Sequence, residues 1–179
     1  MLYAKEYMSP LGQLIMTGNG DDLTGLWFAE QKNVLESFGD QLKDNDSHLP
    51  VFETVKQWLD AYFAGDKPEF ENLPLAPLGT EFRQKVWSIM CKIPYGEVTT
   101  YGAIAKEVAV SLNKAQMSSQ AVGGAVGHNP ISIILPCHRV VGAQGNLTGY
   151  AAGLDKKVWL LKHEGADMSQ FFMPKNSLK

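Results

Sequence analysis

The stretch TTYGAIAKEVAVSLNKAQMSSQAVGGAVGHN, residues 99–129, decides the fold of the second half of the chain. Thr100 suits a helix N-cap, and Ser118 or Ser119 does the same further along; after each cap, apolar residues recur at helical spacing. The two apolar stripes are Tyr101, Ile104, Ala105 and Val108, and then Ala121, Val122, Ala125 and Val126. Two short helices joined by an irregular segment predict a helix-turn-helix.

The second predicted helix has a face that is almost bare of side chains. At about 100° per residue, Gln120, Gly123, Gly124 and Gly127 lie opposite the Ala/Val stripe. Each glycine costs about 1 kcal/mol against alanine in a helix, so a compensating contact is expected. Either a neighbouring helix packs closely there, or the backbone of a partner approaches the face. The residues alone leave both interpretations open.

An almost unbroken apolar run, Ile131–Leu135, follows and predicts a short buried strand or extended segment. It leads through Pro136 to Cys137 and His138. Because a thiol reacts as the thiolate, it needs a lowered pKa or a nearby base, and His138 and Arg139 are the obvious helpers. Neighbouring side chains on an extended chain point to opposite faces, so a water would connect His138 to the sulfur unless the backbone turns there.

A helix is predicted from Leu154 to His163, with Leu154, Val158 and Leu161 on its apolar stripe. Glu164 follows this helix and is the candidate acid that orients His138. The predicted arrangement is a relay from Glu164 through His138 and a water to Cys137.

The first part of the chain has a different pattern. Residues 1–30 alternate as in β-strands, with turn signals at 9–12 and 18–21, and predict an antiparallel meander. Residues 50–64 place apolar side chains at helical spacing and predict an amphipathic helix that packs on this sheet. The first part is therefore a small α+β unit.

A Pro- and Gly-containing linker follows at 66–79, and Thr80 is expected to cap a helix that ends at Pro94. Cys91 lies off the apolar stripe of this helix and is interpreted as a packing residue. The sequence predicts a domain 1–77 and a mainly helical domain 78–179.

Composition limits the class of protein. The net charge of −3 combines −8 over residues 1–77 with +5 over residues 78–179, which suggests a polyanionic partner for the second half. Two cysteines allow neither a disulfide framework nor a cysteine-based zinc site. No run approaches the roughly 18 apolar residues of a membrane helix, and the N-terminus does not resemble a signal peptide, so a cytoplasmic location is expected.

The run Pro136-Cys137-His138-Arg139-Val140 belongs to a longer pattern, with Asn129-Pro130 before it and Gly149-Tyr150 and residues 160–165 (LLKHEG) after it. This pattern resembles the O6-alkylguanine-DNA alkyltransferase family from about Gly79 to Gly165, and more loosely over 1–77. The resemblance implies a ribonuclease-H-like N-terminal domain and a helical, winged-helix-like domain with a helix-turn-helix. It implies DNA repair in one irreversible transfer of an alkyl group from O6 of guanine, with O4 of thymine as a candidate second lesion.

The same resemblance implies a role for each matching residue. Cys137 accepts the alkyl group, His138 is the water-mediated base, Glu164 orients it, and Asn129 braces the reactive turn. The guanine, flipped out of the duplex, is held by the following residues: Tyr101, Val140, Tyr150 and Ala151.

The helix with the glycine face would lie in the minor groove of a duplex carrying O6-alkylguanine, bound by a monomer. Its implied contacts come from Ser119, Gln120, Ala121 and Gly123. Gln120 stands where the family usually has an arginine, and residues 110–117 form a segment about five residues longer than usual, in which Lys114 could contact a phosphate. Ala151 replaces a serine or glycine but keeps the backbone amide.

No cofactor is expected, and the histidines form no metal-ligand pattern. Three rival functions remain at this point. A non-catalytic alkylguanine-recognition module would replace the reactive cysteine, and a cysteine hydrolase would turn over its substrate. A transcription factor is disfavoured, because the glycine face offers few side chains to read bases in a major groove.

Overall fold

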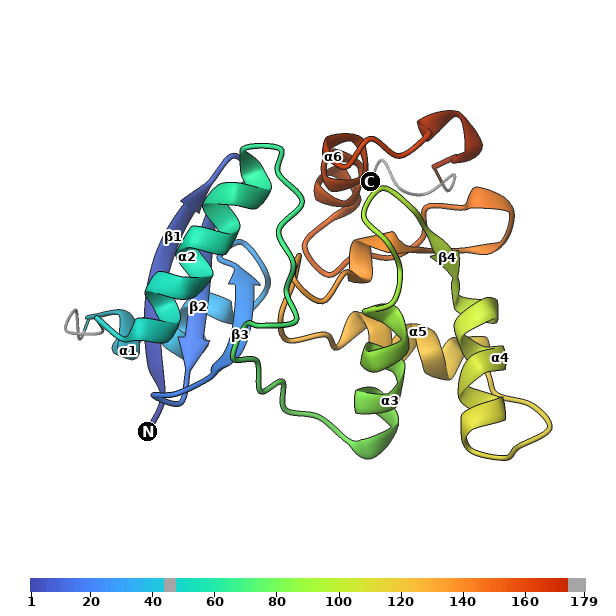
Figure 1. The fold of residues 1–179 in the computed structure, drawn as a ribbon, viewed down its shortest axis with the longest axis horizontal. Coiled ribbons are helices and arrows are strands. Elements are labelled where there is room, and N and C mark those ends of the chain that lie inside the picture. Colours follow the sequence, from blue (N-terminus) through green and yellow to red (C-terminus); the bar gives the residue numbers. More distant parts are fainter. Residues whose placement is uncertain (44–47, 174–179) are drawn as a thin grey trace. The chain divides into compact units, whose positions relative to one another are not determined.

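The computed structural model describes residues 1–43 and 48–173 (Figure 1). The chain divides into two compact units. The first contains residues 1–78 and 130–134, and the second contains residues 79–129 and the part of the chain from 135 onward. In the described ranges, no helix has the length and apolar character needed to cross a membrane.

The first unit is built on the predicted meander. Strands β1 (Tyr3–Ser9), β2 (Gly12–Gly18) and β3 (Leu23–Phe28) are antiparallel in the order β1-β2-β3. Ser9 pairs with Gly12 across the first turn, where Gly12 has a φ of +98° that favours glycine. The prediction of an antiparallel sheet is confirmed.

Two helices complete this unit. The predicted helix is α2 (Pro50–Phe63), which packs on all three strands, and it buries every apolar residue of its predicted stripe. Figure 1 shows α2 lying along one face of the sheet. The other helix, α1 (Val34–Lys43), packs against β1, and the sequence pattern did not predict it.

Residues 130–134 also belong to the first unit. Leu26 donates its backbone N–H to Pro130 (2.8 Å) and accepts one from Ser132 (3.0 Å), so Ile131 forms a parallel bridge with Leu26. The predicted strand is wrong beyond Ile131. Ile133 has a φ of +72°, and Ile134 N–H donates to Ser132 O (2.8 Å), which makes a γ-turn. The run is buried as predicted, but it turns, and a β-branched residue in this conformation is strained.

The second unit begins with three helices: α3 (Glu81–Met90), α4 (Tyr101–Ser111) and α5 (Ser119–Gly127). The predicted caps Thr80, Thr100 and Ser118 each accept a hydrogen bond from the backbone N–H three residues later. Buried side chains hold these helices together, and Trp87 Nε1 donates to Ala125 O (2.8 Å) between α3 and α5. The helix-turn-helix prediction is confirmed, although α3 ends at Met90 rather than near Pro94.

A short parallel pair joins this helical part to the rest of the unit. Strand β4 (Thr99–Thr100) pairs with β5 (Val140–Val141), so that the start of α4 lies beside the chain that leaves Cys137. Helix α6 (Leu154–His163) has the predicted bounds and packs on the turn Cys137–Arg139. Two further 3-10 turns, Ala143–Gly145 and Met168–Gln170, lie on either side of α6 in the sequence.

Candidate active site

Cys137 opens a 3-10 turn, Cys137–Arg139, and its side chain is buried. Two hydrogen bonds set the start of this turn. Cys137 N–H donates to Leu135 O (2.8 Å), with Pro136 at φ −83° and ψ 64°, a second γ-turn. The same carbonyl accepts a bond from Asn129 Nδ2 (2.8 Å). Asn129 therefore ties the end of α5 to the turn that carries the thiol.

The turn changes the predicted relation between Cys137 and His138. An extended chain would place these neighbours about 180° apart, on opposite faces, whereas successive side chains of a 3-10 turn are about 120° apart. His138 is fully buried, and its Nε2 lies 2.7 Å from Glu164 Oε2. The structure thus brings together the predicted His138 and Glu164.

Glu164 is held on several sides. Arg139 donates to it through Nε to Oε1 (2.7 Å) and through Nη2 to Oε2 (3.1 Å), a bidentate pair. Arg139 Nη1 also donates to Ile93 O (2.8 Å), and Gly96 N–H donates to Glu164 Oε1 (3.3 Å). The pairing of Arg139 with Glu164 was not predicted from the sequence.

The protonation of this cluster follows from its geometry. Burial opposes the ionisation of Glu164, but hydrogen bonds and charge from His138 and Arg139 outweigh it and hold the pKa of Glu164 well below its usual range. Burial lowers the pKa of His138 despite its carboxylate partner. Because a carboxylate only accepts hydrogen bonds, the neutral imidazole carries its proton on Nε2. Its Nδ1, which has no hydrogen-bond partner within the described ranges, is left as an acceptor.

Opposing effects act on the pKa of the Cys137 thiol. Burial raises the pKa of Cys137, and hydrogen bonding with Asn129, the charge of Lys157 and hydrogen bonding with Tyr150 all act against this rise. The thiol is therefore held protonated until a base acts on it. A neutral imidazole supported by a carboxylate can serve as that base, so the arrangement can generate a thiolate for nucleophilic displacement.

Lys157 is a residue of this site that the sequence interpretation missed. It is fully buried on α6, and its Nζ donates to the carbonyl oxygens of Val140 (2.6 Å), Thr148 (3.1 Å) and Gly149 (3.1 Å). Burial lowers its pKa to about 8, against the attraction of Cys137. The ammonium joins the chain after Cys137 to the loop that contains Tyr150. The sequence did contain a signal for this burial: Lys157 lies three residues after Leu154 and four before Leu161, within an apolar stripe.

Tyr101, at the start of α4, contacts the same loop. Its hydroxyl donates to Thr148 O (3.1 Å), and its pKa is raised by burial and by proximity to Cys137. Tyr101 also lines an open pocket of about 490 Å³. The other lining residues come from the starts of α4 and α5 and from the loop around Thr148: Thr100, Gly102, Ser119, Gln120, Gly123, Ala143, Thr148 and Gly149.

The predicted base-pocket residues are only partly gathered here. Val140 is buried in β5 and Ala151 is exposed, and neither lines this pocket. Tyr150 does not line it either, but it acts to lower the pKa of the Cys137 thiol.

The predicted bare face of α5 is present. Gln120, Gly124 and Gly127 are exposed, and a Cβ added at Gly124 or Gly127 would meet no atom within 4 Å. An added Cβ at Gly123 would only reach ordinary contact with Tyr101, at 3.9 Å. Helix packing therefore does not require these glycines. Ala121 is a correction, because it is exposed rather than part of the buried stripe: it faces an open pocket at the first turn of α5.

Among the residues of the described ranges, no group of three His, Cys, Asp or Glu side chains is placed to hold a metal ion. Cys91, the other cysteine, is half-buried at the end of α3.

Comparison with known proteins gives consistent matches over both units. Residues 2–77 match the ribonuclease-like domain of 6-O-methylguanine DNA methyltransferase, and residues 81–166 match its DNA binding domain. The methylated-DNA–protein-cysteine methyltransferase of Methanosarcina acetivorans is 43% identical over 165 residues, covering 92% of this chain and 99% of that protein.

Solved structures match in the same way. The Mycobacterium tuberculosis O6-methylguanine methyltransferase superposes with a TM-score of 0.78 at 39% identity, covering 94% of this chain and 98% of that one. The same organism's OGT in complex with DNA gives a TM-score of 0.74 at 39% identity, with 94% of each chain covered.

Proposed function

This chain belongs to the 6-O-methylguanine DNA methyltransferase family, and we propose that Cys137 is the residue that accepts the alkyl group. The chain is a methylated-DNA–protein-cysteine S-methyltransferase: it binds DNA and repairs it by alkyl transfer to one of its own cysteines. The observation that carries the assignment to Cys137 is that His138, its neighbour in the 3-10 turn, is buried and paired with Glu164, with Nε2 of His138 at 2.7 Å from Oε2.

In the proposed reaction, a water passes the thiol proton to Nδ1 of His138, and Glu164 stabilises the charge that forms on the ring. The Cys137 sulfur attacks the alkyl carbon attached to O6 of guanine. The carbon–sulfur bond forms as the carbon–oxygen bond breaks, the guanine leaves with the bonding electron pair, and it regains a proton. The thioether is stable, so each molecule acts once.

The substrate must leave the base stack to react, because a buried thiol cannot reach an atom inside a duplex. We infer that the guanine is held between Tyr101 and the loop of Tyr150 and Ala151, with Val140 behind it. Lys157 acts on this pocket as a positioning residue, since it joins the two chain segments that flank it.

Helix α5 is the proposed contact with a duplex that contains O6-alkylguanine. Its open glycine face permits a close approach of the minor groove, to which Ser119, Gln120, Ala121 and Gly123 contribute. The protein is proposed to act as a monomer.

Intact-mass analysis tests the assignment. After incubation with excess duplex containing O6-methylguanine, the chain should gain one methyl group, and peptide mapping should place it on Cys137. Cys137→Ala should gain none, whereas Cys91→Ala should react as the parent does. An adduct on Cys91, or no adduct, would refute the assignment, and release of product beyond one equivalent would indicate a hydrolase.

A further inference from the structure

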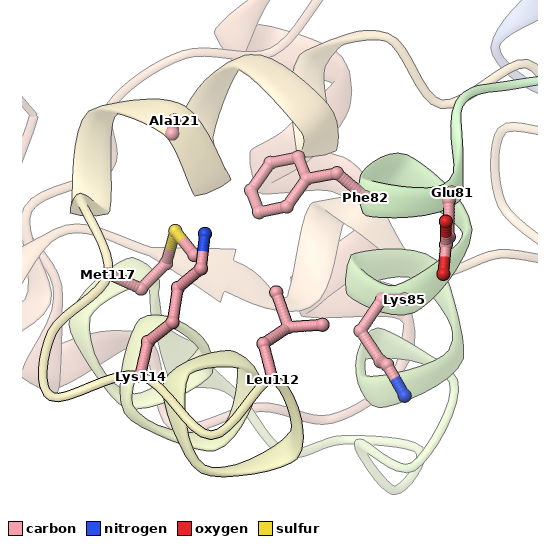
Figure 2. Close-up of a pocket in the computed structure, with 7 residues that line it drawn as sticks. All are labelled: Glu81, Phe82, Lys85, Leu112, Lys114, Met117 and Ala121. Atoms are coloured by element: carbon pink, nitrogen blue, oxygen red, sulfur yellow. The ribbon is translucent and has the colours of Figure 1, made fainter.

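A second open pocket lies in the helical unit, beside the first turn of α5. It has a volume of about 520 Å³ and is formed by the start of α3, the segment after α4 and the start of α5 (Figure 2). Seven residues line it: Glu81, Phe82, Lys85, Leu112, Lys114, Met117 and Ala121. It shares no residue with the pocket of Tyr101.

The way α4 ends creates this pocket. Asn113 has a φ of +57°, and Lys114 N–H donates to Ala109 O (2.8 Å), which stops the helix and fixes the start of the following segment. The segment then runs to Ser118, the cap of α5, without closing over α3. As a result Phe82 and Leu112 remain half-buried, unlike the fully buried Val86 on the next turn of α3.

The lining combines an apolar wall with positive charge. Figure 2 shows the side chains of Lys114, Met117 and Phe82 pointing into the pocket, while Glu81 and Lys85 lie along α3. Within residues 1–43 and 48–173, neither lysine forms an ion pair. An aromatic face beside a free ammonium suits a ligand with a flat ring and an anionic group, as in a nucleotide.

The position of the pocket on α5 indicates where such a nucleotide comes from. At about 100° per residue, the open face of Gln120, Gly124 and Gly127 lies between two flanks. One flank carries Ser119 and Gly123 of the Tyr101 pocket, and the other carries Ala121. A helix in the minor groove has one strand on each side. Because the damaged strand must reach Tyr101 and Cys137, the complementary strand lies on the side of Ala121.

We propose that the pocket of Phe82 and Met117 takes the nucleotide of the complementary strand that loses its partner when the damaged guanine leaves the duplex. Its base lies against Phe82 and Met117, and its phosphate lies at Lys114. This inference rests on the proposed function. An unpaired base leaves the stack at lower cost than a paired one, so the pocket stabilises the state in which the lesion is exposed to the thiol.

A comparison of two duplexes tests the proposal with the full chain carrying Cys137→Ala, so that the lesion is not consumed. O6-methylguanine lies opposite cytosine in one duplex and opposite an abasic nucleotide in the other. In this background, Phe82→Ala should weaken binding of the cytosine duplex by about tenfold, and Met117→Ala by less. Both should leave binding of the abasic duplex unchanged. Val110→Ala, at a residue 80% exposed on α4, is the control and should change neither.

Lys114→Gln tests the phosphate contact. It should weaken binding of both duplexes and lower the slope of log Kd against log salt by about one. Lys92→Gln, two residues beyond the C-terminal end of α3, should do neither. Equal losses on both duplexes for Phe82→Ala and Met117→Ala, or no loss, would overturn the proposal. Met117 lies outside the helices, so Met117→Ala still tests the proposal if Phe82→Ala does not fold. Failure of the proposed function itself would appear separately, as a parent chain that gains no methyl group.

Discussion

Around Cys137, the ionisable side chains His138, Arg139, Lys157 and Glu164 lie buried or nearly so and are held by short hydrogen bonds. The outer face of α5 has the opposite character, since an added side chain at Gly124 or Gly127 would meet no protein atom. One region is fixed by many mutual contacts, and the other is defined by the absence of side chains. The buried cluster around Cys137 suits chemistry that needs fixed protonation states. The outer face of α5 suits close contact with the backbone of another molecule.

The difference also predicts how each region responds to substitution. Changes in the buried cluster should lower both stability and reaction with any substrate, because partners are left unsatisfied. Changes on the face of α5 should leave the fold intact or stabilise it, and affect only reaction with DNA.

The largest effect is expected for Glu164→Gln. The substitution removes the charge opposite Arg139 and leaves a nearly buried guanidinium without its counter-ion, which costs about 3–5 kcal/mol of unfolding free energy. Loss of the orienting carboxylate should slow single-turnover transfer by roughly 10²- to 10⁴-fold. Urea unfolding and rapid-quench kinetics measure the two effects. The exposed Glu97→Gln is the control, and equal behaviour of the two variants would contradict the proposed role.

Lys157→Met should have the next largest effect. Three carbonyl oxygens lose their common donor, at a cost of about 1–3 kcal/mol. Transfer should slow with both duplex DNA and the free alkylated base, because the loop beside the thiol is no longer held. Lys162→Met, at an exposed position of the same helix, should change neither.

Lys157 should also affect how the unfolding free energy depends on pH. Its pKa is about 8 in the folded chain, against an ordinary value of 10.5, so between these two values the unfolded chain binds more protons. The contribution of Lys157 to the unfolding free energy therefore rises with pH over this window. The parent should gain stability there relative to Lys157→Met, and parallel profiles would argue against a buried ammonium.

Much of the architecture was predictable because it follows from local pattern. The alternation of side chains along residues 1–30 predicted the meander of β1, β2 and β3. The capping residues Thr80, Thr100 and Ser118 predicted where three helices begin. These features depend on residues close in sequence, whose propensities act without knowledge of the rest of the chain.

The details of the site depend on tertiary contacts that no local pattern contains. Residues 131–135 are apolar enough for a strand, but the γ-turn at Ile133 bends the chain instead. The burial of Lys157 depends on carbonyl groups of Val140, Thr148 and Gly149, which only the folded loop presents together. Arg139 likewise finds Glu164 across 25 positions of sequence.

A smaller effect is expected from the titration of His138. Burial lowers its pKa below the ordinary histidine value of 6.5, so below that pH the unfolded chain takes up a proton that the folded chain does not. Stability should therefore fall as the pH drops through 6.5, by at most about 1.4 kcal/mol per pH unit. His138→Asn should lose this slope, while the exposed His48→Asn should keep it. A slope retained in His138→Asn would place its origin elsewhere.

The smallest change in stability, of opposite sign, is expected for Gly124→Ala. Alanine is favoured over glycine in a helix by about 1 kcal/mol, and the added methyl group would enter open space. Thermal unfolding should therefore show a more stable protein. The same methyl group would stand where the DNA backbone approaches, so reaction with duplex DNA should slow while reaction with the free base stays unchanged.

Gly39→Ala is the matched control for this variant, because Gly39 lies within α1 and an added Cβ there also meets nothing within 4 Å. Both substitutions should stabilise the chain by a similar amount, but only Gly124→Ala should slow repair of the duplex. If both variants repaired DNA equally well, the open face of α5 would not be the DNA contact, and its glycines would need another explanation. If Gly124→Ala instead slowed reaction with the free base as well, the face would act on the thiol through the fold, and the contrast between the two regions would fail.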